Sequence, residues 1–252
     1  MPDTVEVAPI ETREKLSTRK AYGYGLLKLV QKNPNVVVLD AETSNSTYAN
    51  MVKEAAPDRF FEMFIAEQNM AGVALGLSRR GKIPFASTFG AFWTRAHDQI
   101  RMAQYSGGNI KFIGSHAGVS IGADGSSQMA LEDISLFRCI HDSVVLYPSD
   151  AISTEVLVQT AAEYQGNVFV RTTRSDTEYI YDLDDNNFQI GGSRVLKSSK
   201  NDEVTVVAAG ITLHEALEAY KKLKKQGIAI RVIDLYSICL LYTSDAADDE
   251  TS

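Results

Sequence analysis

The chain is short of cysteine and of net positive charge, and each shortage excludes a class of protein. Cys139 and Cys239 are the only cysteines in 252 residues, too few and too far apart for a disulfide framework or a zinc cluster. We expect both to be packing residues. The formal net charge of -7 argues against nucleic acid as a partner, because the neutralisation of phosphates needs clustered Lys and Arg.

Long apolar runs are missing as well. No stretch reaches the roughly 18 consecutive apolar residues of a membrane-spanning helix. The start of the chain, Met1-Pro2-Asp3-Thr4, lacks the basic and then apolar pattern of a signal peptide. We therefore expect a cytoplasmic protein with no membrane partner. Hydrophobic residues make up 44% of the chain, which is enough for one or two buried cores.

Apolar runs of strand length alternate with segments of helical period from residue 13 to about residue 171. This alternation is typical of a parallel sheet with helices on both faces, so the predicted fold class is α/β. Another helix opens at Glu67. The other predicted helices cover 13–32, 92–107, 127–138 and 151–164, and the predicted strands cover 35–40, 60–65, 84–88, 109–114, 143–147 and 167–171.

A polar stretch at 174–192 reads as an exposed connection between two domains. The first predicted domain is 13–182. The second, 193–238, has a strand, an amphipathic helix and a strand, which is an incomplete α/β domain because so small a unit leaves most of its sheet unpaired. Composition changes abruptly in 239–252, which we interpret as an aberrant or disordered tail.

Glu67 follows an apolar strand and opens a helix. In an open parallel sheet this junction lies at the carboxyl edge of the strands, where ligands bind. The alternative is a carboxylate that only complements the helix dipole. The pattern leaves both roles open. At the same edge, Phe89 and Phe92 flank Gly90-Ala91, where a flat heterocycle could stack, although most such rings belong to a core.

The glycine-rich segment 114–128 permits positive φ angles and close approach of the backbone. It matches neither a dinucleotide fingerprint nor a P-loop, and its His116 is either functional or a solvated loop residue. Arg19 with Lys20, Ser46 and Arg174 could converge at the same sheet edge. Converging basic groups there would suit a sugar phosphate, because arginine can contact phosphate oxygens through two nitrogens.

Several blocks, in this order, resemble transketolase, a family that moves a two-carbon ketol unit between sugar phosphates in the pentose phosphate pathway. The family uses thiamine diphosphate and a divalent metal ion. The blocks are Phe64-Ile65-Ala66-Glu67-Gln68-Asn69-Met70, Ser87-Thr88-Phe89-Gly90-Ala91-Phe92-Trp93-Thr94-Arg95-Ala96, Asp98-Gln99-Ile100-Arg101-Met102-Ala103 and residues 114–133.

The resemblance implies a cofactor side of the site. Glu67 matches the catalytic carboxyl that holds a proton on the aminopyrimidine ring of thiamine diphosphate and so makes the thiazolium carbon reactive. Phe92, with Phe89 beside it, matches the aromatic seat of that ring. Gln128 matches a polar contact to the cofactor. The chain would thus supply the pyrimidine-binding domain followed by a partial C-terminal domain.

The resemblance also implies a substrate side. His116, in a catalytic role, and Asp124 match groups near the sugar hydroxyls and the reacting carbons. Arg19, Ser46 and Arg174 match groups near the phosphate.

No segment resembles the other half of the family, which holds the diphosphate and the metal ion, Mg²⁺. The resemblance therefore implies a partner half, from a separate subunit or a missing N-terminal region, and a homo- or hetero-oligomer. Ser126 also departs from the family, which usually has proline there.

Two alternatives remain open. Another thiamine diphosphate enzyme, such as deoxyxylulose-phosphate synthase or the β subunit of a 2-oxo acid dehydrogenase, would share the catalytic Glu67. His116, Asp124 and Arg174 favour the sugar-phosphate branch. A non-catalytic assembly or regulatory subunit is the other alternative, and the retained Glu67 argues against it.

Overall fold

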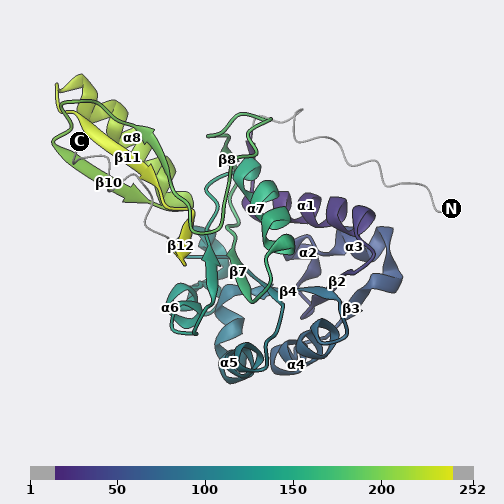
Figure 1. Ribbon diagram of the computed structural model, residues 1–252. Helices are drawn as coiled ribbons and strands as arrows, with labels where there is room; N and C mark the ends of the chain where they lie inside the picture. Colours follow the sequence, from purple (N-terminus) through teal and green to yellow (C-terminus); the bar gives the residue numbers. More distant parts are fainter. Residues whose placement is uncertain (1–14, 241–252) are drawn as a thin grey trace.

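The computed structural model describes residues 15–240 and contains one large sheet and two small ones (Figure 1). The large sheet has the order β12-β6-β7-β5-β4-β2-β3, and only the β12–β6 pair is antiparallel. The predicted α/β class is confirmed. The strands are β2 (Val36–Asp40), β3 (Phe60–Glu62), β4 (Ile83–Phe89), β5 (Lys111–Ser115), β6 (Val144–Leu146), β7 (Val168–Arg171) and β12 (Ser237–Cys239).

Helices cover both faces of the large sheet (Figure 1). On one face, α1 (Thr18–Lys32) packs against α7 (Ala151–Glu163); on the other, α4 (Glu67–Ser78) packs against α5 (His97–Tyr105). The shorter helices are α2 (Ser44–Thr47), α3 (Asn50–Ala55), α6 (Asp133–Arg138) and the 3₁₀ turns η2 (Pro57–Arg59), η3 (Gly90–Ala96), η4 (Val119–Asp124) and η5 (Ser126–Gln128).

The alternation of side chains along each strand divides the interior into two cores. In β7, Val168 and Val170 join the core beneath α1 and α7, whereas Phe169 between them joins the core beneath α4 and α5. This is the period of two that a strand imposes. Both faces of a parallel sheet must be covered, which explains why its strands read as continuous apolar runs.

A buried ion pair ties the start of α6 to β7. Arg171 donates from Nε and Nη2 to the two oxygens of Asp133, at 2.7 and 3.1 Å. A third bond runs from Nη2 to the carbonyl of Ala130 at 2.8 Å. Both charged side chains are buried, so each satisfies a partner that has no access to water.

A smaller unit follows the large sheet and projects from it (Figure 1). It contains β9 (Arg194–Lys197), β10 (Val204–Ala208), β11 (Ile230–Asp234) and α8 (Ile211–Lys225), in the strand order β10-β11-β9. The chain then returns as β12 to the edge of the large sheet beside β6. Asp234 links the two parts, because it accepts hydrogen bonds from Ser149 and Tyr181 at 2.9 and 2.6 Å.

Several predicted element boundaries are wrong. The helix predicted over 13–32 begins at Thr18, because Lys15–Leu16 forms β1, which pairs with β8 (Thr177–Glu178). The strand predicted over 60–65 ends at Glu62. The helices predicted over 92–107 and 127–138 each begin with a 3₁₀ turn, η3 or η5, rather than running as one α-helix.

The connection 174–192 is not wholly exposed, because Tyr181 and Phe188 are buried in the main core. Cys139 is exposed, so the expectation that it packs in the interior is wrong. The bounds of the two domains stay predictions. In the predicted tail, 239–252, Cys239 ends β12, and the residues beyond 240 lie outside the described part of the chain. Among the described helices, none is long and apolar enough to cross a bilayer.

We predict that Asp133→Ala lowers the free energy of unfolding by about 3–5 kcal/mol, because it leaves the Arg171 guanidinium buried without its counter-charge. Urea unfolding at one fixed chain concentration measures this. Glu218→Ala, which breaks an exposed pair with Lys221 on α8, is the control and should leave the midpoint unchanged. Equal midpoints for both variants would contradict the role given to the ion pair.

Candidate functional site

The candidate residues come from segments that follow strands of the large sheet or lie against its carboxyl edge. Phe89 ends β4, and His116 follows β5 directly. Arg174 comes three residues after β7, and Ser46 lies in α2 after β2. Because the strands are parallel, their carboxyl ends share one edge, and the topology gathers these side chains there.

Glu67 is the first residue of α4 and only 1% exposed. Its Oε2 accepts a hydrogen bond from Arg95 Nη1 at 3.2 Å. Its Oε1 is buried and has no hydrogen-bond partner among the described residues. A buried acceptor without a partner costs about 1–3 kcal/mol. Interaction with the helix dipole does not remove that cost, so Oε1 calls for a donor beyond the described residues.

A row of stacked rings runs from Arg95, the partner of Glu67, to the glycine-rich loop. The Phe89 ring stacks on Phe92, with centroids 5.1 Å apart, and on His116, with centroids 3.8 Å apart. The Arg95 guanidinium lies 5.1 Å from the centroid of Phe92. Phe89 is buried, whereas Phe92 is partly exposed. Phe92 is therefore the ring that a planar ligand could reach.

Two close contacts hold this row in place. Trp93 donates from its indole nitrogen to the carbonyl of Ile113 at 2.9 Å, which ties η3 to β5. Gly114 lies so close to Phe169 and Gly90 that a Cβ on it would sit 2.6 Å from the Phe169 ring and 3.0 Å from the Gly90 Cα. Only glycine at 114 lets η3 approach β5 this closely.

His116 has a left-handed backbone, with φ of 60°, and a buried ring. Its Nδ1 lies 3.0 Å from the hydroxyl of Ser115, and its Nε2 lies 3.5 Å from Asp124 Oδ2. Burial lowers the pKa of His116 to about 4, and the charge of Arg19 adds to this effect while Asp124 opposes it. The imidazole is therefore neutral at pH 7 and can donate through one nitrogen and accept through the other.

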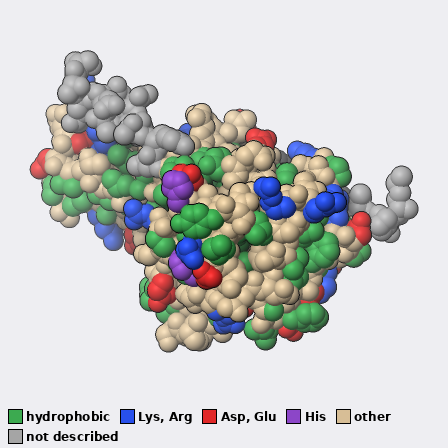
Figure 2. All heavy atoms as spheres, turned by 60° about the horizontal axis from the view of Figure 1, so that its bottom comes forward, with side chains coloured by type: hydrophobic (Ala, Val, Ile, Leu, Met, Phe, Trp, Pro, Cys, Tyr) green, Lys and Arg blue, Asp and Glu red, His purple; other side chains and the backbone are tan. Residues whose placement is uncertain are grey.

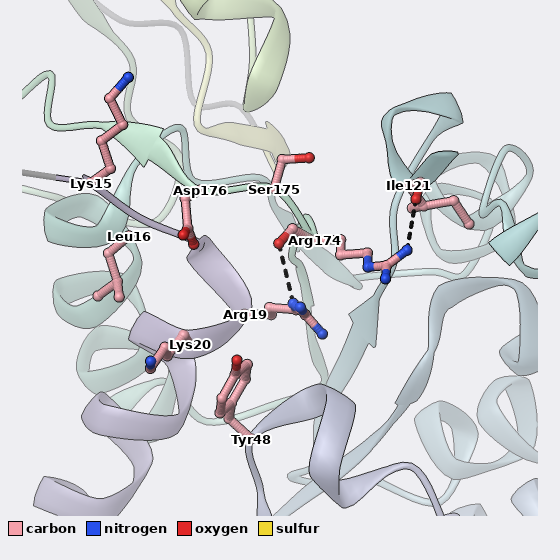
Figure 3. Close-up of a pocket in the computed structure, with 9 residues that line it drawn as sticks. All are labelled: Lys15, Leu16, Arg19, Lys20, Tyr48, Ile121, Arg174, Ser175 and Asp176. Atoms are coloured by element: carbon pink, nitrogen blue, oxygen red, sulfur yellow. Dashed lines mark hydrogen bonds between the residues drawn. The ribbon is translucent and has the colours of Figure 1, made fainter. Parts of the chain in front are cut away.

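The basic residues converge on a cavity of about 360 Å³ (Figure 3). Arg174 Nη1 lies 2.8 Å from Asp124 Oδ2 and donates to the carbonyl of Ile121 at 2.9 Å. Arg19 donates to the carbonyls of Ser46 and Arg174, at 2.9 and 3.3 Å. Ser46 thus meets Arg19 through its backbone carbonyl. Burial lowers the pKa of Arg19, but arginine remains a cation at neutral pH.

Gln128 is less closely connected to the other candidates. It lies in η5, which packs against η3, the turn that carries Phe92. Its backbone nitrogen donates to the carbonyl of Gly125 at 3.2 Å. Within residues 15–240, no hydrogen bond joins its side chain to another candidate. The same part of the chain contains no group of three His, Cys, Asp or Glu residues that could hold a metal ion.

Two residues at the site escaped the sequence analysis. Arg95 pairs with Glu67 and lies over Phe92, yet the sequence signals it only by its place in one of the quoted blocks. Tyr48 lines the cavity beside Arg19 and carried no sequence signal.

On the face shown in Figure 2, acidic and basic side chains are scattered among hydrophobic ones rather than gathered by sign.

Comparison with known proteins agrees with this geometry. The family model described as "Transketolase, pyrimidine binding domain" matches residues 14–178, and "Transketolase, C-terminal domain" matches residues 193–248. Transketolase-like protein 2 of Mus musculus is 55% identical over 226 residues, and transketolase of Homo sapiens is 51% identical over the same length. Each match covers 89% of this chain and 36% of the relative.

Two solved structures that resemble this chain are also transketolases. A chain described as a split gene transketolase in an inactive beta4 tetramer is 45% identical, with a TM-score of 0.79, and the match covers 88% of this chain and 72% of that one. Transketolase from Campylobacter jejuni shares the fold, with a TM-score of 0.84 at 24% identity, over 98% of this chain and 39% of the other. This chain spans about a third of the curated relatives named above, and it belongs to the transketolase family.

Proposed function

We propose that this chain supplies the pyrimidine-binding side of a transketolase active site. Combined with a diphosphate-binding half, it transfers a two-carbon ketol unit between sugar phosphates. The observation that carries the proposal is the buried, unpaired Oε1 of Glu67, at the edge that also presents the stacked row of Phe92, Phe89 and His116.

The residues of this edge fit thiamine diphosphate. When bound, the cofactor supplies a carbon that stabilises carbanions, which ketol transfer requires. Glu67 Oε1 would share a proton with a nitrogen of the pyrimidine ring and so gain its missing partner. Arg95 holds the other carboxylate oxygen in place, and the partly exposed Phe92 would carry the face of the ring. Gln128 would add a polar contact.

His116 and Asp124 would act on the substrate. The neutral imidazole of His116 can exchange a proton with a sugar hydroxyl without first losing a charge. Ser115 fixes the ring through Nδ1, and the Asp124 carboxylate lies beside Nε2. The stack on Phe89 also restrains the ring. These contacts would orient the hydroxyl groups next to the reacting carbons.

Arg174, Arg19 and Ser46 would hold the phosphate of the sugar. The two guanidinium groups line one cavity with space for a phosphoryl group. Arg174 already faces a carboxylate, Asp124, so it would exchange part of that contact for phosphate oxygens when the substrate binds. Guanidinium and phosphate match in shape as well as in charge.

The partner half would hold the diphosphate and a Mg²⁺ ion. Phe64 is 65% exposed and Ile65 is 73% exposed, and both lie just before Glu67. Large exposed apolar side chains beside a site are typical of an interface. We therefore propose an oligomer in which the partner covers this turn, as a homo- or hetero-oligomer.

A reconstitution tests the proposal. Mixed with the diphosphate-binding half of a split transketolase, thiamine diphosphate and Mg²⁺, the chain should form sedoheptulose 7-phosphate from xylulose 5-phosphate and ribose 5-phosphate. A coupled assay with mass spectrometry of the products measures it. Consumption of pyruvate, with no sugar-phosphate product, would instead favour the related thiamine diphosphate enzymes.

Glu67→Gln should lower kcat of the reconstituted complex by about 10²–10⁴-fold, because the amide cannot share the proton that the carboxyl holds. The variant should fold normally, with an unchanged far-ultraviolet circular dichroism spectrum. Glu163→Gln, on the exposed end of α7, is the matched control. Unchanged activity in Glu67→Gln would remove the catalytic role of this residue.

Arg174→Ala should raise KM for xylulose 5-phosphate by about 10–100-fold, the worth of a charge-assisted hydrogen bond, and should change kcat little. The KM for xylulose without its phosphate should stay the same. Steady-state kinetics of the complex with both donors separate the two outcomes, and Arg80→Ala, at an exposed position, serves as the control. An equal loss for both donors would show that Arg174 does not read the phosphate.

A further inference from the structure

Tyr48 occupies an unusual position at the end of α2. Its backbone is left-handed, with φ of 66°, a conformation that is uncommon for residues other than glycine and is a genuine outlier for a bulky side chain. Such a conformation persists only where the surrounding structure enforces it, and it is often found at functional sites. The contacts that enforce it here come from β2 and α1.

Asp40, at the end of β2, fixes the turn that carries Tyr48. Its Oδ1 accepts the backbone N–H of Thr43 at 2.6 Å, and its Oδ2 accepts the hydroxyl of Thr47 at 2.7 Å. Both carboxylate oxygens are thus used to anchor the two ends of α2. Tyr48, which follows Thr47 directly, therefore has little freedom to adopt another backbone conformation.

Gly23 lets α1 approach this turn. A Cβ at residue 23 would lie 2.6 Å from the Cβ of Tyr48 and 2.8 Å from its carbonyl oxygen, distances that real side chains do not show. Gly25, two residues later on the same helix, has its nearest neighbours at 3.5 Å, which is ordinary contact. Of these two glycines, only Gly23 is therefore required by the close contact with Tyr48.

The Tyr48 ring carries two cations. The Arg19 guanidinium lies 5.3 Å from the ring centroid, and the Lys20 ammonium lies 5.6 Å from it. Both distances fall within the range of a cation–π contact. Figure 3 shows these three residues around the cavity that Arg174 also lines. Two like charges on neighbouring residues repel each other, and a shared ring together with a bound anion would offset that repulsion.

We propose that Tyr48 is a positioning residue that holds Arg19 and Lys20 toward the cavity, and that Lys20 is a further contact for the phosphoryl group of the substrate. The proposal rests on the proposed function and deepens it, because it names what makes the site selective for phosphorylated sugars. Tyr48 itself need not touch the substrate. Its ring sets where the two cations stand before the sugar phosphate arrives.

Two variants of Tyr48 in the reconstituted complex separate the ring from the hydroxyl. Tyr48→Leu keeps an apolar side chain but loses the π face, and it should raise KM for xylulose 5-phosphate by about 3- to 30-fold. Its kcat and its KM for xylulose should hold. Tyr48→Phe should stay within about twofold for all of these, since the ring remains. Equal losses for both sugars, or no change in Tyr48→Leu, would overturn the proposal.

Gly23→Ala tests the same idea without changing any group at the cavity. The added Cβ should displace Tyr48 and reproduce the rise in KM for the phosphorylated sugar alone. Gly25→Ala, on the same helix, is the matched control and should behave as the natural chain. A Gly23→Ala complex that is folded and has the natural KM for xylulose 5-phosphate would contradict a positioning role for Tyr48.

Binding of inorganic phosphate to the full chain without a partner makes the test independent of catalysis. Isothermal titration calorimetry should show saturable binding that weakens in Tyr48→Leu and in Lys20→Ala and persists in Tyr48→Phe. If the chain shows this pattern of phosphate binding while the reconstituted complex makes no sugar phosphate, the cation site is upheld and the proposed function is rejected. No saturable binding by the natural chain, or equal binding by all variants, would reject the cation site.

Discussion

The site depends on the carboxylate of Glu67, which the described residues bury while they give a hydrogen-bond donor to only one of its two oxygens. Arg95 pairs with one oxygen of Glu67, and no residue within 15–240 donates to the other. Burying this acceptor without a donor costs about 1–3 kcal/mol of folding free energy. The rest of the protein must offset that cost. Folded domains have net stabilities of only about 5–15 kcal/mol, so the burial of apolar side chains in the two cores is what makes such a residue tolerable.

The same carboxylate explains why rigid contacts surround it. A hydrogen bond that is completed only when a ligand arrives needs an acceptor that does not relax toward another partner. Trp93 fixes η3 to β5, and η3 carries both Arg95 and the partly exposed ring of Phe92. Gly114 brings β5 close beneath that turn. The stack of Phe89 on His116 then places the substrate side relative to the cofactor side.

Residues whose place depends on strand order could be predicted from the sequence. Glu67 lies at the carboxyl edge because every strand-to-helix junction of a parallel sheet does, and the alternation of Val168, Phe169 and Val170 required two covered faces. Contacts across turns could not be predicted. Arg95 reaches Glu67 over 28 residues from η3, a 3₁₀ turn before α5, and periodicity does not distinguish such a turn from the first turn of a helix.

After the smaller unit, the chain returns as β12 and forms the edge strand of the large sheet. β12 pairs with β6, so the backbone groups along that side of β6 are occupied only when residues that come after β11 are in place. An unpaired strand at a sheet margin is a template for association with other chains. By pairing with β6, β12 keeps that strand from being the exposed margin of the large sheet, so the segment that follows the smaller unit covers a place where another chain could otherwise add a strand.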